Sequence, residues 1–207
     1  LFKKNKVDYI RGIGSVEGTG KVGVIGNDGS RVLHETKDIL IATGCKSRGL
    51  PNFPFNGTSI IGSKEAMILA QQPKELIIIG AGAIGVEFAY IYNAFGTKVT
   101  LVEMAPRILP VEDDEVGDAL EKSLIKQGIR VLTNTKITNT VDKGSSVEIT
   151  VEGPKENGTI SAQICLVAIG IQPVLPGGLP LELDRGYIKV GDRYETSIPG
   201  VYAAGDI

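Results

Sequence analysis

Apolar residues along this chain follow two periods, one typical of strands and one typical of helices. Between residues 7 and 34, apolar and polar types alternate and glycine-containing turns separate the runs, which predicts a β-meander beginning at residues 7–11. Residues 38–44 form a continuous apolar run that closes on glycine, the pattern of a strand buried on both faces. A linker containing glycine and proline spans residues 45–62, and we place a domain boundary there.

Beyond this linker, strand and helix patterns alternate, which predicts a parallel α/β sheet. Ser63 can N-cap a short helix that includes Ala70 and that Pro73 ends. Two longer helices are each followed by a glycine that can cap them, Gly96 and Gly128. In chain order, the further elements are expected at residues 76–79 (strand), 83–95 (helix), 99–102 (strand), 113–127 (helix) and 129–132 (strand).

The strand pattern returns between residues 137 and 164, where alternating stretches are broken by glycine-containing turns. It predicts a three-stranded β-meander inserted as a crossover, after which the apolar strand at 164–169 rejoins the parallel sheet. Beyond Pro173 the chain is rich in proline and glycine, and its end is expected to rejoin the first domain. The predicted segments are therefore 1–47, 48–172 and 173–207.

A glycine-rich turn lies between the strand at 76–79 and the following helix. Its sequence, Gly-Ala-Gly-Ala-Ile-Gly, fits the dinucleotide-binding motif of a Rossmann-like fold. Gly80 permits the tight turn, Gly82 lets the backbone approach a pyrophosphate, and Gly85 lets helix and strand pack closely. The N–H groups of the first helical turn, at Ala83 and Ile84, would face the phosphate charge. The alternative is a tight strand-to-helix turn without a ligand.

Glu103 stands at the end of the second strand of this βαβ unit, where an acidic residue contacts the adenosine ribose. A carboxylate accepts hydrogen bonds from both ribose hydroxyls and repels a 2′-phosphate, so NAD is favoured. Arg107 lies close enough in sequence to raise the possibility of NADP, although a phosphate there would still meet Glu103. A solvated acid at a strand end is the alternative for Glu103.

These residues, with others spread over nearly the whole chain, resemble the dihydrolipoamide dehydrogenases among the flavin-dependent pyridine nucleotide-disulfide oxidoreductases. The resemblance implies an enzyme that passes electrons from dihydrolipoamide through a redox disulfide and FAD to NAD. It also implies a homodimer and a lipoamide-bearing partner protein. The segments that carry the resemblance are 42–44 (Ala-Thr-Gly), 79–87, 102–103 (Val-Glu), 168–170 (Ala-Ile-Gly) and 205–206 (Gly-Asp).

The resemblance assigns the first and last segments to an incomplete FAD-binding domain and the middle segment to the NAD-binding domain. Asp206, after Gly205, would bind a ribityl or pyrophosphate-proximal oxygen of FAD. At the end of the 38–44 strand, Thr43 and Gly44 would let the chain pass close to the flavin nucleotide. All four residues are therefore expected to contact FAD.

Three further NAD contacts follow from the same resemblance. Glu87 would lie near the nicotinamide, where it could orient the carboxamide or a nearby lysine, or it is a solvent-facing helix acid. Gly170 would make room for the nicotinamide ribose and Ile137 for the adenine or its ribose, or both are packing positions.

The catalytic groups of such enzymes are a CxxxxC disulfide and a His-Glu pair, and this sequence encodes neither. Cys45 and Cys165 are too far apart in sequence for such a motif and are expected to be ordinary thiols, with His34 structural and no zinc site. We expect a fragment without catalytic residues, bound flavin or turnover of lipoamide. The sequence also begins without methionine and stops at Ile207 within an apparent element, which fits an excised or partly ordered piece.

Residues 170–173, Gly-Ile-Gln-Pro, lack the arginine pair that many lipoamide dehydrogenases carry before this proline. NADH oxidases, mercuric reductases and glutathione-type reductases therefore stay open, although the last usually carry basic residues where Glu103 stands. A non-catalytic, redox-sensing NAD-binding module is the alternative outside the enzymes.

Composition narrows the partners further. The net charge of −2 and the pI near 5.6 argue against nucleic acid and anionic membranes as partners. The sequence has no apolar run near the roughly 18 residues of a spanning helix and no signal-peptide pattern. A cytoplasmic protein is expected, or one of the mitochondrial matrix if the source is eukaryotic.

Overall fold

A computed structural model describes residues 1–51 and 53–207 of the chain. They form two compact units. Unit 1 contains Leu1–Lys46 and Gln172–Ile207, and unit 2 contains Ser47–Ile171. None of the helices in the described residues is long and apolar enough to cross a membrane.

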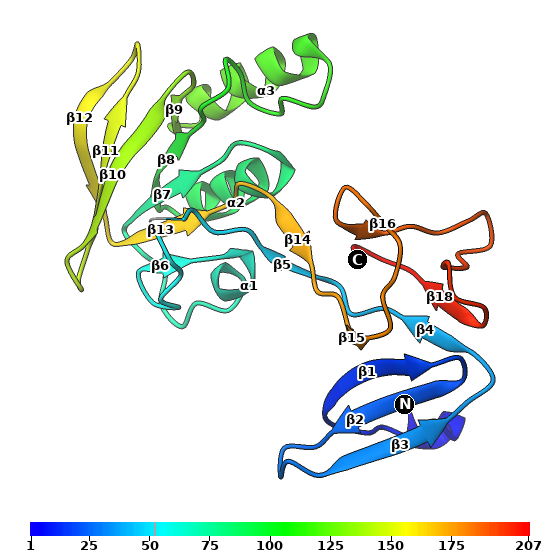
Figure 1. Ribbon diagram of the computed structural model, residues 1–207. Helices are drawn as coiled ribbons and strands as arrows, with labels where there is room; N and C mark the ends of the chain where they lie inside the picture. The colour runs from blue at the N-terminus through cyan, green and yellow to red at the C-terminus, as the bar shows by residue number, and fades with distance from the viewer. Residues whose placement is uncertain (52) are drawn as a thin grey trace. The chain divides into compact units, whose positions relative to one another are not determined.

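Unit 2 is built on a five-stranded parallel sheet with the strand order β6-β13-β7-β8-β9 (Figure 1). The neighbouring strands β13 and β7 consist almost entirely of apolar residues, as expected for strands that are covered on both faces. The strands are β6 (Ile60–Ile61), β7 (Glu75–Ile79), β8 (Lys98–Val102), β9 (Arg130–Leu132) and β13 (Ile164–Val167).

Helices cover one face of this sheet, and a β-meander covers the other (Figure 1). Leu76 and Ile78 of β7 point to the helical side, where Val86 is buried with them. Ile77 of β7 points to the opposite side and packs with Ile149 of the meander. The helices are α1 (Ser63–Ala66), α2 (Ala83–Ala94) and α3 (Asp114–Lys126), and the meander is β10 (Lys136–Asp142), β11 (Val147–Glu152) and β12 (Asn157–Ala162). The α/β class and the inserted meander are thus as predicted.

The two longer helices end where the sequence predicts. Gly96 and Gly128 both have φ +92°, a left-handed conformation that glycine adopts without strain. The short helix α1 differs from expectation, because Gly62 is its N-cap and Ser63 is its first residue. The N–H of Gly62 donates to the Glu65 carboxylate at 3.1 Å. The helix also stops at Ala66, since the exposed side chains that follow it gain little from further helix.

Unit 1 contains an antiparallel meander whose first strand is also paired, in parallel, with a two-residue strand. A second sheet pairs β4 with β18 in parallel, and β16 with β17 forms a hairpin. The elements are η1 (Lys3–Asn5), β1 (Ile13–Gly18), β2 (Lys21–Ile25), β3 (Arg31–Glu35), β4 (Ile39–Ile41), β15 (Gly177–Gly178), β16 (Leu183–Asp184), β17 (Tyr187–Ile188) and β18 (Val201–Ala203). The strands β5 (Cys45–Ser47) and β14 (Ile171–Pro173) form a separate two-stranded sheet.

Two expectations for unit 1 are wrong. Residues 7–11 form no strand because they pair with no strand of the described chain; they follow a 3-10 turn that Lys6 ends in a left-handed conformation. The strand at 38–44 is shorter than predicted, and only one of its faces is covered by the described residues. Ile39 and Ile41 are buried, whereas the side chain between them, Leu40, is 64% exposed.

Candidate functional site

A cavity of about 640 Å³ opens in unit 2 at the carboxyl ends of the parallel strands. Its wall is formed by residues that end or follow β7, β8, β9 and β13, with Leu50 from the segment before β6. Ligands bind at this edge in open α/β sheets, because the loops after the strands diverge there.

Most of the residues predicted to bind NAD meet in this wall. They are Gly80, Gly82, Ala83, Ile84, Glu103, Ile137 and Gly170. Gly85 and Glu87 are not among the described residues that line the cavity. Gly85 is buried under the turn, and Glu87 is exposed on α2.

The three glycines of the turn differ in what surrounds them. Gly80 has φ +98°, and a Cβ there would lie 2.5 Å from the carbonyl oxygen of Ala168. A Cβ at Gly85 would overlap the carbonyl oxygen of Gly80. At Gly82, in contrast, a Cβ would meet no protein atom within 4 Å. The protein's own packing therefore requires glycine at two positions, while the third faces free space in the cavity wall.

The amino end of α2 faces the same cavity. Its first hydrogen bond runs from the N–H of Val86 to the carbonyl oxygen of Gly82 at 3.1 Å. The N–H groups of Ala83, Ile84 and Gly85 therefore lie outside the helical ladder. With the positive end of the helix dipole, they form a setting that favours an anion.

Glu103 is fixed by the backbone around it. Its Oε2 accepts a hydrogen bond from the N–H of Ala81 at 2.7 Å, and its Oε1 accepts one from the N–H of Ala105 at 2.8 Å. The backbone N–H of Glu103 donates to Leu132, and its carbonyl oxygen accepts from Thr135. Each carboxylate oxygen retains acceptor capacity, so the side chain can receive donors from a ligand without moving.

Several wall residues were missed in the sequence analysis, including Met104, Pro110, Thr135 and Lys136. Their only signal is position, since they follow β8 or precede Ile137. Arg107, in contrast, is absent from the described wall and forms an ion pair with Asp114 of α3. The hydrogen bond that Arg107 donates to the Asp114 carboxylate raises the pKa of the Arg107 guanidinium.

In unit 1, the structure brings together the four residues predicted to bind FAD. Thr43 and Gly44 follow β4, while Gly205 and Asp206 follow its parallel partner β18. The Cys45 thiol donates to the Asp206 carboxylate at 3.9 Å. Thr43 and Gly44 are held by hydrogen bonds to the backbone of Val174.

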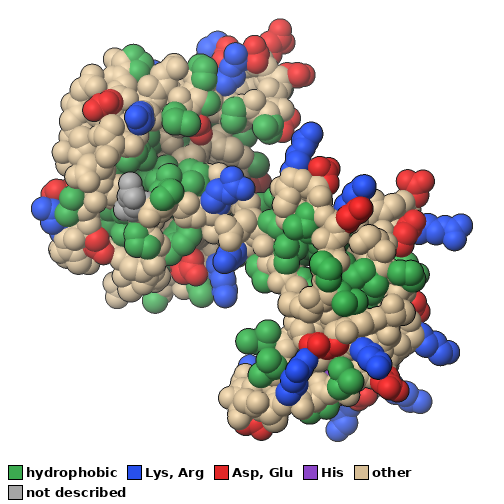
Figure 2. Space-filling model, in the orientation of Figure 1, with side chains coloured by type: hydrophobic (Ala, Val, Ile, Leu, Met, Phe, Trp, Pro, Cys, Tyr) green, Lys and Arg blue, Asp and Glu red, His purple; other side chains and the backbone are tan. Residues whose placement is uncertain are grey.

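The remaining sulfur and imidazole groups show no catalytic arrangement among the described residues. Cys165 is fully buried in β13, and this burial raises the pKa of its thiol. His34 lies on β3, with Nε2 buried and without a hydrogen-bond partner in the described part of the chain. Within residues 1–51 and 53–207, no three His, Cys, Asp or Glu residues group as metal ligands. Basic and acidic side chains are interspersed on the face shown in Figure 2.

A family model described as pyridine nucleotide-disulphide oxidoreductase matches residues 1–207. Dihydrolipoyl dehydrogenase of Chlorobaculum tepidum is 40% identical over 213 residues, which cover 100% of this chain and 45% of that protein. The mitochondrial dihydrolipoyl dehydrogenase of Dictyostelium discoideum is also 40% identical, over 100% of this chain and 44% of its own length. The chain thus spans just under half the length of these curated relatives.

The fold of the chain is also similar to solved structures of flavoprotein disulfide reductases and related proteins. LpdA from Mycobacterium tuberculosis matches with a TM-score of 0.84 and 30% identity, over 99% of this chain and 46% of the other. The Cu(II) complex of the HOCl-induced flavoprotein disulfide reductase RclA from Escherichia coli has a TM-score of 0.85 and 27% identity. That match covers 100% of this chain and 47% of the other.

Proposed function

Because the chain belongs to the pyridine nucleotide-disulphide oxidoreductase family, we propose that unit 2 is its NAD-binding domain and that the cavity holds the nucleotide. The observation that carries this proposal is the carboxylate of Glu103, held by two backbone N–H groups in the wall of the cavity. The amino end of α2 lies in the same wall, so one site offers both a ribose acceptor and an anion-binding helix end.

The residues present fit a dinucleotide. The free space beside Gly82 would admit a pyrophosphate to the N–H groups of Ala83 and Ile84. Glu103 would accept the hydroxyls of the adenosine ribose, with Ile137 nearby on the adenosine side. Gly170, whose φ is +121° and whose α-carbon carries no side chain, would border the nicotinamide ribose. Gly85 would support the turn from below, and Glu87 would lie toward the nicotinamide.

The chemistry that NAD supplies when bound is acceptance of a hydride. The contribution of this chain is to bind and orient the nucleotide. NAD is favoured over NADP because a 2′-phosphate would meet the charge of Glu103. Arg107, the residue that could offset that charge, is already paired with Asp114.

For unit 1, we infer a contribution to the FAD-binding domain. Thr43, Gly44, Gly205 and Asp206 lie at the carboxyl ends of two paired parallel strands, where such domains hold their ligands. Asp206 is exposed and can accept hydrogen bonds from FAD. Unit 1 would thus supply part of an FAD site, and unit 2 would supply the whole NAD site.

For the whole enzyme, we propose oxidation of dihydrolipoamide by NAD, through FAD and a redox disulfide, in a homodimer that acts on a lipoamide-bearing protein. The 40% identity to two dihydrolipoyl dehydrogenases supports this over an NADH oxidase or mercuric reductase. The catalytic disulfide and acid-base pair are not assigned to any residue of this chain. A bacterial cytoplasm or a mitochondrial matrix fits the named relatives.

Replacement of Glu103 tests the nucleotide assignment. Glu103→Ala should weaken NADH binding about ten- to a hundredfold, because a charged hydrogen bond contributes roughly 1.5–3 kcal/mol. Discrimination against NADPH should shrink in the same variant. Fluorescence titration of both nucleotides measures both effects, with Glu112→Gln, an exposed acid in the same unit, as the control.

Two outcomes would end the proposal. One is NADPH binding to the unmodified chain as tightly as NADH. The other is an NADH to NADPH affinity ratio that stays the same in the Glu103→Ala variant.

A further inference from the structure

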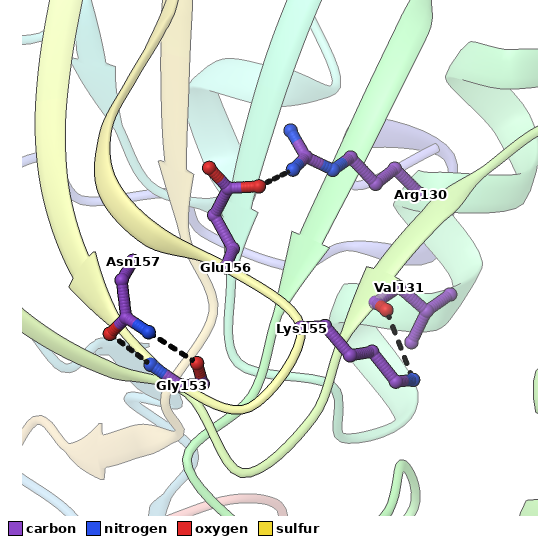
Figure 3. A network of polar contacts seen from close by, with 6 residues as sticks. All are labelled: Arg130, Val131, Gly153, Lys155, Glu156 and Asn157. Atoms are coloured by element: carbon purple, nitrogen blue, oxygen red, sulfur yellow. Dashed lines mark hydrogen bonds and ion pairs between the residues drawn. The ribbon is translucent and has the colours of Figure 1, made fainter.

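The turn at residues 153–156, which joins β11 to β12, is bonded to the edge strand β9 and to the helix α3. Arg130 of β9 forms an ion pair with Glu156 (Figure 3). Lys155 Nζ lies 3.0 Å from Glu121 Oε1 of α3 and donates to the carbonyl oxygen of Val131 at 3.3 Å. We name the side chains of Arg130, Glu156, Lys155 and Glu121 the turn clasp.

The turn clasp closes an open edge of the sheet. β9 is the last strand in the order β6-β13-β7-β8-β9. Among the described residues, no strand of this sheet therefore pairs with the outer edge of β9. Lys155 pairs with one of these carbonyl oxygens, at Val131. The Glu121 side chain is 17% exposed and the Lys155 side chain is 46% exposed, so this ion pair is partly shielded from water.

The turn itself is rigidly bonded. The N–H of Gly153 donates to the carbonyl oxygen of Glu156 at 2.9 Å. The Asn157 side chain donates to the carbonyl oxygen of Gly153 at 3.1 Å and accepts from its N–H at 3.3 Å (Figure 3). A displacement of Lys155 or Glu156 would therefore also displace Gly153.

Gly153 rests directly on the cavity wall. A Cβ at this position would lie 2.9 Å from Thr135 Cβ, closer than real Cβ atoms approach, and 3.0 Å from Thr135 Cα, which is a tight contact. Thr135 is 1% exposed, and its N–H donates to the carbonyl oxygen of Glu103 at 2.9 Å. Thr135, Lys136 and Ile137 all line the cavity.

We propose that the turn clasp positions the wall formed by residues 135–137 against Glu103, and so sets the affinity for the adenosine half of the nucleotide. The inference rests on the proposed function of the cavity. Lys155, Glu156 and Gly153 are positioning residues, because each acts through Thr135 rather than by touching the ligand. The opposite end of the meander carries an ion pair between Lys143 and Glu148 and lines no part of the described cavity, so it provides a matched control.

Two variants of the 207-residue chain test the proposal. In Lys155→Met/Glu156→Gln the turn is released, and in Gly153→Ala the new methyl group pushes on Thr135. Each should weaken binding of NADH and of ADP-ribose by the same factor, roughly two- to tenfold, because both ligands share the adenosine half. Lys143→Met should leave both affinities unchanged, and Lys155→Arg should retain them.

A ligand-free measurement separates this proposal from the nucleotide assignment. Amide hydrogen exchange at residues 135–137 should accelerate in the released variant while exchange in β13 stays slow, which also shows that the variant folds. If neither NADH nor ADP-ribose binds the unmodified chain, the proposed function fails, and the exchange result still decides whether the turn clasp holds the wall. Unchanged exchange at 135–137, or weaker NADH binding with ADP-ribose binding unaltered, would overturn the inference.

Discussion

In the proposed site, the Glu103 side chain would both hold the glycine-rich turn and accept hydrogen bonds from the nucleotide. Each of its carboxylate oxygens already accepts a backbone N–H, from Ala81 in the glycine-rich turn and from Ala105 in the loop after β8. The side chain therefore braces the turn before any ligand arrives, and it presents its remaining acceptor capacity in a fixed direction. A pre-oriented acceptor loses little conformational freedom on binding, which favours affinity.

Substitution by the isosteric amide exposes this bracing role. In Glu103→Gln, the amide nitrogen must face one of the two N–H groups, so a donor meets a donor in a half-buried place. The ligand-free variant should lose about 1–3 kcal/mol of unfolding free energy, as an unsatisfied buried donor does. Urea unfolding measures this loss of unfolding free energy, with Glu112→Gln as the comparison. Equal stability of the two variants would show that the two hydrogen bonds to Glu103 do not stabilise the fold.

Cys165 gives the protein a pH dependence that the sequence does not reveal. Burial raises the pKa of its thiol in the folded state. At alkaline pH the unfolded chain then releases the proton while the folded chain keeps it, so stability is present below the unfolded pKa of about 8.5 and falls above it. The slope can reach about 1.4 kcal/mol per pH unit for this one group.

The matched variant for this prediction is Cys165→Ala, which removes the titrating group. Unfolding free energies between neutral and alkaline pH should converge for the two proteins as pH rises, although the alanine variant starts lower because of its cavity. Parallel pH curves would contradict the assignment of the slope to Cys165.

At the scale of elements, two glycines in the turn between β7 and α2 are expected to have different roles, one in stability and one in ligand binding. A Cβ at Gly85 overlaps the carbonyl oxygen of Gly80, whereas a Cβ at Gly82 meets only free space in the cavity wall. Gly85→Ala should therefore destabilise the chain by about 1–3 kcal/mol, as overpacking does. Gly82→Ala should leave the unfolding midpoint close to that of the unmodified chain but weaken NADH binding, because the methyl group would occupy the space proposed for the pyrophosphate. Thermal unfolding and NADH titration of both variants measure this, and equal effects on stability would refute it.

The elements that the sequence predicts well are those whose signals are local. Gly96 and Gly128 stop the helices α2 and α3, and the alternation of apolar residues marks the inserted meander. The predicted strand at residues 7–11 failed because alternation alone carries no information about a pairing partner. Leu40 was predicted buried for a similar reason, since an apolar run does not show which faces its neighbours cover.

The candidate site divides in the same way. Its glycines and Glu103 follow from a motif in which each position has a local reason. Thr135 and Lys136 enter the cavity wall only because β10 starts beside β9, and the bonds from Ala81 and Ala105 to Glu103 depend on the folded course of the loop. Such contacts are long-range consequences of packing, which no spacing in the sequence encodes.

At the scale of the whole molecule, the two units have separate cores. Two clusters of buried apolar residues lie entirely within unit 2, on either side of its parallel sheet. A third cluster, which includes Val16, Ile39 and Val201, lies entirely within unit 1. Every described residue that lines the cavity also belongs to unit 2. We therefore expect the proposed nucleotide site to depend on unit 2 alone.

Excision of residues 47–171 tests this separation directly. The excised chain keeps both of its cores, the five-stranded sheet and all of the wall residues, so it should fold cooperatively and bind NADH within about threefold of the 207-residue chain. Circular dichroism reports the folding, and fluorescence titration with NADH reports the site. If the excised chain folds but its affinity for NADH is lower by more than about tenfold, then residues 1–46 or 172–207 contribute to the nucleotide site, and the assignment of NAD binding to unit 2 alone must be abandoned.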